Sequence, residues 1–169
     1  MGSTLKGKSA IVTGATSGIG NAIASAFAEE GCNLMFNGFG DSEEIEAFRG
    51  NLSDRHDVDV FYDKCDLTDL AQISAMIANA LERFGRIDIL VNNAGHDIGG
   101  RRQFHEGTTA QWAATIETNV IGLIRVTRTV LDRMVERNTG HIVNIGSVAG
   151  IQAYTACAAY AASKHAVHG

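Results

Sequence analysis

The sequence predicts an α/β fold in which a doubly wound parallel sheet lies between two layers of helices. Short apolar runs alternate with longer stretches of helical periodicity along the 169 residues. The runs lack the in-and-out alternation of strands that face water, which indicates burial on both faces. A glycine-rich segment separates the first apolar run from the first helical stretch. Right-handed crossovers between such elements produce three α/β/α layers.

The hydrophobic pattern predicts each element in turn. The apolar runs indicate strands at residues 9–13, 33–37, 58–62, 87–91 and 141–145. Apolar side chains spaced three or four apart indicate helices at residues 19–30, 43–55, 70–84 and 109–137, and a last helix bears Tyr160. No linker, repeat or low-complexity segment divides the chain, so residues 1–169 are expected to form one domain.

The bulk composition argues against several classes of function. A net charge of −5 offers nothing that attracts nucleic acid or an anionic membrane surface. No apolar run approaches the roughly 20 residues that cross a bilayer, and residues 1–8 lack the apolar centre of a secretion signal. The three cysteines are widely spaced and odd in number, which favours buried thiols over disulfides or zinc. These features are typical of a cytoplasmic protein.

Residues 13–20 have the composition of a phosphate-binding turn. Glycines between a strand and a helix let the backbone turn sharply and approach a pyrophosphate, while the helix N-terminus offers N–H groups and a positive dipole end. The spacing is G-x3-G-x-G rather than G-x-G-x-x-G. On the first strand–helix unit of a Rossmann-type sheet, this segment predicts that a dinucleotide is bound by Thr13, Gly14, Thr16, Ser17, Gly18, Ile19 and Gly20.

The end of the second strand usually selects the nucleotide. An acidic residue there binds the ribose 2′-hydroxyl, and a basic residue favours a 2′-phosphate. Asn37 can bond a ribose hydroxyl, Gly38 follows it, and Asp41 would repel a phosphate. Neither this segment nor the glycine segment contains lysine or arginine. NAD is therefore favoured over NADP, although Asn37 before a glycine is also a common turn residue.

Asp66 and Leu67 follow the third predicted strand. A carboxylate at this place can accept a hydrogen bond from the adenine amino group. It can also serve helix capping, because Thr68 and Asp69 precede the next helical stretch. Both roles stay open for Asp66.

With these segments placed, the sequence resembles the short-chain dehydrogenase/reductase family over residues 6–169. The motifs that carry the resemblance are residues 13–20, Asp66, Asn-Asn-Ala-Gly at 92–95, Asn119, and Ser147 with Tyr-Ala-Ala-Ser-Lys at 160–164. Each motif is short, but their order and spacing together are specific. The resemblance implies that Asn93, Ala94 and Gly95 line the cofactor site. It also implies that Asn119 keeps the long helix open around a water that leads to the lysine.

The chemistry is expected at Tyr160 and Lys164, which are four residues apart and therefore share one face of a helix. A phenol is a poor base at neutral pH, but a nearby ammonium and the positive nicotinamide stabilise the phenolate. Tyr160 is thus predicted as the general acid/base of an alcohol–carbonyl pair, and Lys164 also as a ligand of the nicotinamide ribose. Ser147 is predicted to bond the substrate oxygen. With Asn119, these residues form the predicted catalytic set.

Two resemblances within the family point to different substrates. Residues 37–46 resemble bacterial D-3-hydroxybutyrate dehydrogenases, which use NAD. Where those enzymes hold the substrate carboxylate with Gln, His and Lys, this chain has Asp97, Ala149 and Cys157, and Asp97 would repel a carboxylate. Residues 118–150 are closer to NADP-dependent reductases of 3-hydroxy acids and serine, and the same pattern occurs in 3-oxoacyl reductases. The sequence therefore predicts a small or medium-sized secondary alcohol, a hydroxy acid or a similar compound, or its ketone, as substrate. A 3-oxoacyl reductase-like enzyme is the alternative.

The loop after the fourth strand supplies further candidates. His96 and Asp97 are expected to line the substrate pocket, because ligands bind at the carboxyl ends of such strands. Arg101 and Arg102 either bind an acidic substrate or lie on a solvated loop. The histidines lack carboxylate partners at zinc spacing, so no metal is expected.

The resemblance also implies two more strands, a substrate-covering loop and its helix after residue 169. Without them the fifth strand is an open sheet edge. Two alternatives stay open. The sequence is part of an NAD(P)-dependent oxidoreductase, or it is a nucleotide-binding module without turnover. For the longer protein, the resemblance implies a homo-oligomer, a dimer or tetramer, with the helix of Tyr160 at a subunit interface.

Overall fold

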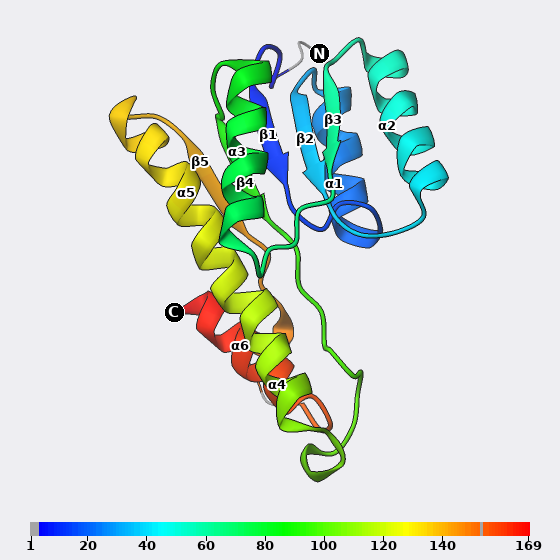
Figure 1. The fold of residues 1–169 in the computed structure, drawn as a ribbon, viewed down its shortest axis with the longest axis vertical. Helices are drawn as coiled ribbons and strands as arrows, with labels where there is room; N and C mark the ends of the chain where they lie inside the picture. Colours follow the sequence, from blue (N-terminus) through cyan, green and yellow to red (C-terminus); the bar gives the residue numbers. More distant parts are fainter. Residues whose placement is uncertain (1–3, 153) are drawn as a thin grey trace.

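A computed structural model describes residues 4–152 and 154–169, which form one five-stranded parallel sheet with its helices (Figure 1). The strands are β1 (Ser9–Val12), β2 (Asn33–Asn37), β3 (Val60–Asp63), β4 (Ile89–Asn92) and β5 (His141–Asn144). Their order across the sheet is β3-β2-β1-β4-β5. The chain thus winds outward from β1 in both directions, and the place between β1 and β4 is the switch point at which open α/β sheets bind ligands.

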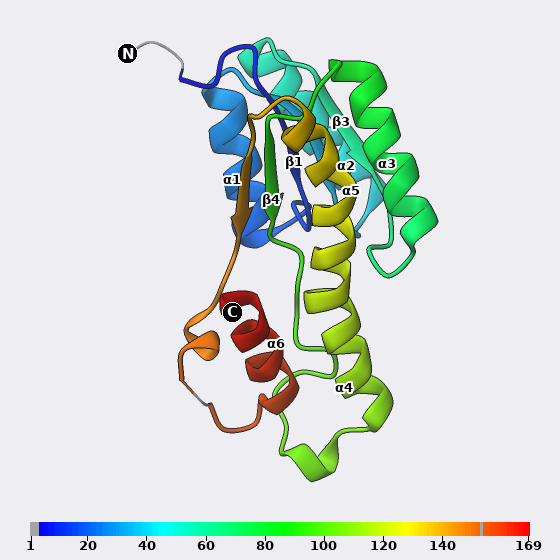
Figure 2. The same cartoon turned by 90° about the vertical axis from the view of Figure 1, so that its left-hand side faces the viewer.

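Helices cover both faces of the sheet (Figures 1 and 2). The helices α1 and α2 pack on one face, and α3 with α5 packs on the other, which confirms the three-layer fold. The helices α4 and α6 pack against each other beyond the carboxyl ends of the strands (Figure 2). The bounds are α1 Gly18–Glu29, α2 Ser42–His56, α3 Leu70–Phe84, α4 Thr109–Ile116, α5 Leu123–Glu136 and α6 Ala158–His168. Shorter segments are the 3-10 turns η1 Phe104–Glu106 and η3 Val148–Gly150 and the π-helical segment η2 Glu117–Gly122.

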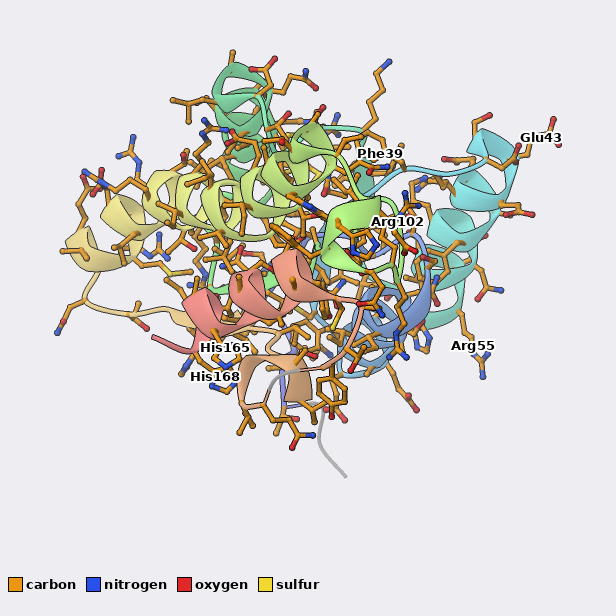
Figure 3. All side chains as sticks on the ribbon, turned by 90° about the horizontal axis from the view of Figure 1, so that it is seen from below. Phe39, Glu43, Arg55, Arg102, His165 and His168 are labelled. Carbon is orange, nitrogen blue, oxygen red and sulfur yellow. The ribbon has the colours of Figure 1, made fainter. Side chains whose placement is uncertain are left out.

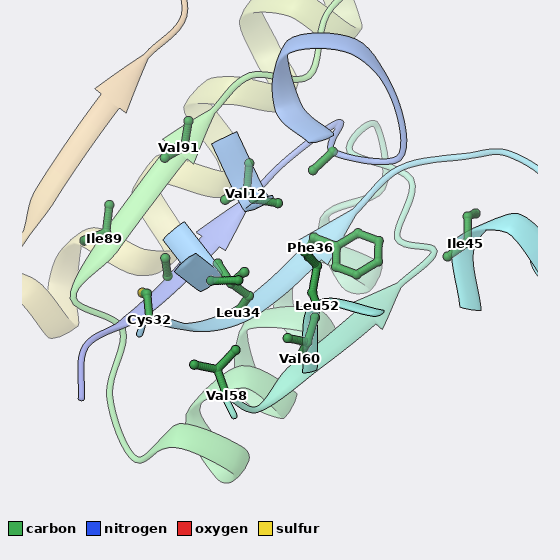
Figure 4. Close-up of a cluster of buried hydrophobic side chains, with 14 residues drawn as sticks. Val12, Cys32, Leu34, Phe36, Ile45, Leu52, Val58, Val60, Ile89 and Val91 are labelled. Atoms are coloured by element: carbon green, nitrogen blue, oxygen red, sulfur yellow. The ribbon is translucent and has the colours of Figure 1, made fainter. Parts of the chain in front are cut away.

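The pleat of the strands divides the apolar residues between two cores. Val12, Leu34 and Phe36 face α1 and α2 (Figure 4), whereas Ile11 and Met35 face α3 and α5. Successive side chains of a strand point to opposite faces of a sheet. A strand that is apolar at every position therefore serves both cores, and burial on both faces is confirmed for the central strands.

Capping groups define where the helices begin and end. Asp41 Oδ1 accepts hydrogen bonds from the backbone N–H groups of Glu43 and Glu44 at 2.9 and 3.0 Å, and Asp69 caps α3 in the same way. Gly85 follows α3 as its C-terminal cap, with a φ of +73° that suits a glycine. The helix predicted at 70–84 therefore agrees with α3, and the one predicted at 43–55 is one residue short of α2 at each end.

The strand β5 is an open edge in the described part of the chain. It pairs with β4 alone, and Val143 is 43% exposed. Asn92 ties this edge to the sheet, since its Nδ2 donates to Asn144 Oδ1 at 2.9 Å and to Thr127 Oγ1 on α5 at 2.8 Å. The open edge expected from the sequence is confirmed, and Asn92 joins β4 to β5 and to α5.

Candidate active site

A cavity of about 670 Å³ opens at the carboxyl ends of the strands. Parallel strands bring these ends to one edge, so loops that are far apart in the sequence meet there. Of the predicted cofactor residues, those that line the cavity are Gly14, Thr16, Ser17, Gly18, Ile19, Asn37, Gly38, Asp66, Leu67, Asn93, Ala94, Gly95, Tyr160 and Lys164. Thr13 and Gly20 are not among the lining residues; they are buried and shape the glycine loop.

Thr13 holds the glycine loop to the segment after β4. Its Oγ1 accepts hydrogen bonds from the backbone N–H groups of Asn93 and Ala94, both at 3.1 Å, and donates to the carbonyl oxygen of Val91 at 3.3 Å. Asn93 Nδ2 donates in return to the carbonyl oxygens of Thr13 and Gly14, each at 2.9 Å. The hydroxyl uses its one donor and two acceptor positions, so Thr13 supports the site without facing it.

Close approach of backbones explains two glycines of the loop. Gly14 has a φ of +63°, and a Cβ there would lie 2.7 Å from Cα of Ala94. A Cβ on Gly20 would collide with the side-chain amide of Asn93. Within the described residues, α1 begins after Ser17 without a side-chain cap. Its first N–H groups therefore remain available to an anion, as pyrophosphate binding requires.

Asn37 is buried at the end of β2, where its amide binds backbone groups. Nδ2 donates to the carbonyl oxygens of Cys65 at 2.6 Å and Asp63 at 3.3 Å, and Oδ1 accepts from the N–H of Gly14 at 3.4 Å. Both amide hydrogens are used, which leaves one lone pair of Oδ1 for a ribose hydroxyl. The structure thus shows a role that sequence reasoning missed, because Asn37 joins β2, the loop after β3 and the glycine loop. The ribose contact stays a prediction.

Phe39 lines the cavity and is 68% exposed (Figure 3), although sequence reasoning did not select it. Its turn is held in place, because Thr16 Oγ1 donates to the carbonyl oxygen of Phe39 and the Tyr62 hydroxyl donates to that of Gly38, both at 2.8 Å. Asp41, which was expected to repel a phosphate, caps α2 and is not among the lining residues. The sequence feature that could have indicated Phe39 is an aromatic residue between two glycines at the end of the second strand.

Asp66 and Leu67 line the cavity after β3. Asp66 Oδ1 accepts hydrogen bonds from the backbone N–H and the hydroxyl of Thr68, at 2.9 and 2.8 Å. The capping of α3 falls to Asp69, so Asp66 organises the turn before the helix and does not cap it. The hydrogen bond that Asp66 would accept from the adenine amino group stays a prediction. Its other carboxylate oxygen, Oδ2, takes no part in the bonds to Thr68.

The helical stretch predicted at 109–137 has the expected extent but is not a regular α-helix. The π-helical segment η2 interrupts it between α4 and α5, and Asn119 is buried within that segment. Asn119 Oδ1 accepts from the N–H of His96 at 3.0 Å, and Nδ2 donates to the carbonyl oxygen of His96 at 3.1 Å and to Ser163 Oγ at 3.0 Å. Such π-helical turns frequently occur at functional sites. The opening of the helix agrees with the family resemblance, and the water stays a prediction.

Lys164 and Tyr160 lie together on α6. Lys164 Nζ is 5.8 Å from the centroid of the Tyr160 ring and donates to the carbonyl oxygen of Ile145 at 2.8 Å. Lys164 is 5% exposed, and burial lowers the pKa of its ammonium group below the ordinary value. Ser163 Oγ donates to the carbonyl oxygen of Tyr160 at 2.7 Å and accepts from Asn119, which ties α6 to the π-helical segment.

A second cavity of about 580 Å³ adjoins the first, because Tyr160 lines both. Ser147 lines only the second, and its Oγ accepts a hydrogen bond from the N–H of Ala149 at 3.1 Å. Asn119 lines neither cavity and lies behind Gly95, where a Cβ would be 3.1 Å from Asn119 Oδ1. The structure thus brings the predicted catalytic set to one junction, with Asn119 as its buried support.

The residues after β4 divide between the two cavities. His96 lines the first, while Asp97 and Arg101 line the second. The Arg102 guanidinium donates to the carbonyl oxygen of Gly99, and the Arg102 N–H donates to that of Ala156 at 2.9 Å. Arg102 therefore holds the loop, whereas Arg101 faces a cavity.

The cysteines and histidines show no metal site. All three cysteines are buried and unpaired, as predicted, and burial raises the pKa of Cys32 and of Cys65 to about 12. Those two thiols therefore stay protonated at neutral pH. His165 and His168 lie on α6, close to η3 (Figure 3). Residues 4–152 and 154–169 contain no cluster of side chains suited to a metal ion.

The parallel sheet, the cavity at its switch point and the glycine loop define a Rossmann-type dinucleotide-binding fold. The family model for short chain dehydrogenases matches residues 8–169. The chain belongs to the short-chain dehydrogenase family. Within its described part, every helix is too short or too polar to cross a lipid bilayer.

Relatives within the family have several activities. The chain is 38% identical over 165 residues to a D-beta-hydroxybutyrate dehydrogenase of Cupriavidus necator, covering 98% of this chain and 62% of that protein. It is 40% identical over 154 residues to the NADP-dependent 3-hydroxy acid dehydrogenase YdfG of Salmonella typhi, covering 91% of this chain and 60% of that protein. The chain therefore spans about three fifths of the length of these relatives.

Solved structures confirm the fold. An NAD+-bound xylitol dehydrogenase superposes with a TM-score of 0.90 at 30% identity, covering 97% of this chain and 62% of that one. An actinorhodin polyketide ketoreductase with NADPH superposes with a TM-score of 0.87 at 40% identity, covering 95% of this chain and 60% of that one. Similar chains thus bind either nicotinamide dinucleotide.

Proposed function

We propose that residues 1–169 form one dinucleotide-binding domain, which supplies the cofactor site and catalytic residues of an NAD(P)-dependent oxidoreductase. The reaction is the interconversion of a secondary alcohol and a ketone. The observation that carries the proposal is the place of Tyr160, at the junction of the switch-point cavity and the second cavity. A nicotinamide in the first cavity and an alcohol in the second would meet at the side chain of Tyr160.

Each residue of the junction has a chemical role in this proposal. A bound oxidised cofactor would supply the acceptor for the hydride of the alcohol carbon. Tyr160 accepts the hydroxyl proton as general base, and the Lys164 ammonium beside it stabilises the phenolate. The Ser147 hydroxyl donates to the substrate oxygen, since its Oγ already accepts the N–H of Ala149. Asn119 positions α6 through Ser163. In the reverse direction Tyr160 donates the proton to the ketone oxygen.

The cofactor is held by groups along the first cavity. The glycine loop and the first N–H groups of α1 would bind the pyrophosphate, and Lys164 the nicotinamide ribose. Among the described residues that line this cavity, Lys164 is the one lysine or arginine, and it lies on α6. A 2′-phosphate beside Asn37 and Phe39 would lack a cationic partner there. NAD is therefore the proposed preference over NADP.

Location and assembly are also proposed. Three unpaired buried thiols favour a reducing compartment, the cytoplasm. Ile124, Leu131 and Val135 of α5 are 53, 37 and 67% exposed, and neighbouring exposed apolar side chains are typical of a protein interface. The proposed state of the enzyme is a homo-oligomer, a dimer or a tetramer.

Cofactor titration and turnover test this function. The purified chain should bind NAD and reduce it with a secondary alcohol. The variant Tyr160→Phe should lose about 10²–10⁴-fold in kcat/KM because it lacks the acid/base, while its NAD affinity persists. His165→Gln, at an exposed position of the same helix, serves as the matched control and should retain activity. Normal turnover by Tyr160→Phe, or failure of the wild-type chain to bind NAD and NADP, would refute the proposal.

A further inference from the structure

An arginine of α5 joins the π-helical segment η2 to the wall of the first cavity. Arg125 Nη1 donates to Glu117 Oε1 at 2.5 Å and to the carbonyl oxygen of Thr68 at 2.8 Å. Glu117 is the first residue of η2, and Thr68 lines the first cavity. One guanidinium group therefore binds both the beginning of η2 and the turn that follows β3.

The spacing of this ion pair depends on the π-helical turn. In a regular α-helix, residues eight apart differ by about 80° around the axis. A π-helical turn forms i→i+5 bonds and so contains about one residue more than an α-helical turn. Across such a turn, residues eight apart lie roughly where residues seven apart lie in an α-helix, which differ by only about 20°. Glu117 and Arg125 therefore share one face because η2 is π-helical, and a regular α-helix would turn their side chains apart.

The other end of η2 packs directly on the same turn. A Cβ on Gly122 would lie 3.0 Å from the carbonyl oxygen of Leu67 and 3.3 Å from its Cβ. Leu67 lines the first cavity together with Thr68. Both ends of η2 are thus attached to residues 67–68, the beginning through Arg125 and the end through Gly122.

Asn119 lies between these two attachments. Its buried amide binds the backbone of His96 and donates to Ser163 Oγ, which in turn donates to the carbonyl oxygen of Tyr160. An α-helical register in η2 would change the direction of the Asn119 side chain relative to these partners. The position of α6 behind the cavity therefore depends on the register of η2.

We propose that Arg125 and Glu117 are a positioning pair, which fixes the π-helical register of η2 and thereby holds Asn119 in place behind the catalytic residues. This inference rests on the proposed function. Neither side chain is among the described residues that line the two cavities. The pair therefore acts on Tyr160 through Asn119 and Ser163.

Arg49 of α2 provides a matched control. Its guanidinium pairs with Glu46 Oε1 at 2.5 Å and donates to the carbonyl oxygen of Val60 at 3.2 Å. Its side chain is 31% exposed, compared with 30% for Arg125. Both arginines thus make one ion pair and one bond to a distant carbonyl group, but Arg49 joins α2 to β3 rather than to η2. Arg49→Met and Arg125→Met should therefore lower the urea midpoint by similar amounts.

Amide exchange reports the position of Asn119 without requiring turnover. The N–H of His96 donates to Asn119 Oδ1, so its exchange, measured by NMR on the chain without cofactor, follows this contact. It should be about three- to tenfold faster in Arg125→Met than in Arg49→Met, because a partly exposed ion pair and one hydrogen bond are lost beside η2. Glu117→Gln should change it in the same direction. The double variant should exchange no faster than Arg125→Met, because the two side chains act as one pair.

Turnover tests the consequence for catalysis. With saturating NAD and butan-2-ol, kcat should fall about tenfold in Arg125→Met, because small displacements of catalytic groups slow a reaction strongly. Arg125→Lys, which keeps the charge, should recover part of this loss. Glu117→Gln leaves the bond from Arg125 to Thr68, so its kcat should fall while its Kd for NAD stays within about twofold of the wild-type value. Arg49→Met should retain the wild-type kcat.

The outcomes separate this inference from the proposed function. Equal exchange of the His96 N–H in Arg125→Met and Arg49→Met, additive effects in the double variant, or a wild-type kcat in Arg125→Met would overturn the positioning role. If the wild-type chain binds NAD but does not oxidise butan-2-ol, the exchange comparison decides alone. Failure of the wild-type chain to bind NAD and NADP refutes the proposed function instead, and the exchange comparison still tests the pair.

Discussion

Two glycines of the cofactor loop allow backbone strain to be separated from close packing. Gly14 and Gly18 both have left-handed conformations, with φ of +63° and +56°. A Cβ on Gly18 would have no atom within 4 Å, whereas a Cβ on Gly14 would lie 2.7 Å from Cα of Ala94. Both alanine variants therefore incur conformational strain, and only Gly14→Ala also forces two backbone segments apart.

The magnitudes follow from these two contributions. The left-handed conformation costs an alanine about 1–2 kcal/mol, which is the expected loss for Gly18→Ala. Overpacking adds about 1–3 kcal/mol, so Gly14→Ala should lose about 2–5 kcal/mol in the free energy of unfolding. Ala94 cannot yield as a flexible side chain would, because its N–H is bonded to Thr13 Oγ1 at 3.1 Å.

Urea unfolding measures both variants against the wild type. Far-ultraviolet circular dichroism follows the helices, and the fluorescence of Trp112, the one tryptophan, follows α4. Equal midpoints for Gly14→Ala and Gly18→Ala, with equal slopes, would refute the close approach of the loop to Ala94. In the same titrations, excess NAD should stabilise the wild type more than either variant, because both glycines line the cofactor cavity.

Three further outcomes are expected. Asn119→Ala should lower the free energy of unfolding by about 1–3 kcal/mol, measured by urea titration, because Asn119 is buried and its hydrogen bonds to His96 and Ser163 are lost; an unchanged midpoint contradicts this. Burial lowers the pKa of Lys164 below 10.5, so the unfolded chain binds more protons and stability should rise with pH up to that value. In Lys164→Met, the urea midpoint should rise less between neutral and alkaline pH than in the wild type. An equal rise in both proteins would contradict the lowered pKa of Lys164 in the folded chain. Phe39→Arg should shift the ratio of NADP to NAD affinity by about tenfold towards NADP in fluorescence titrations, and a constant ratio would place the ribose elsewhere.

Local patterns account for most of the fold prediction. Asn33–Asn37 and Leu70–Phe84 were predicted with the observed bounds, because a buried strand and a capped amphipathic helix carry strong local signals. The π-helical segment was not predicted from periodicity. Asn119 leaves the regular helical pattern by bonding the backbone of His96 and the side chain of Ser163, and both partners are distant in sequence.

In the active site, too, some features follow from local sequence motifs and others from contacts between distant segments. The family motifs led to Tyr160, Lys164 and Ser147, and the structure brings these residues to one junction. They did not reveal that Asn37 bonds Asp63 and Cys65. They also did not select Phe39, whose exposure at the cavity depends on how the turn after β2 folds.

The sequence by itself determined the order of strands and helices, the family and the residues that we propose carry the chemistry. These follow from local periodicity and from short motifs, which need no knowledge of distant contacts. Only the tertiary structure decided that Tyr160 joins two cavities and that Arg125 joins Glu117 to Thr68. The physical reason is that a cavity and a contact between distant residues are defined by every chain segment around them. Those segments meet only when parallel strands bring their carboxyl ends to one edge of the sheet.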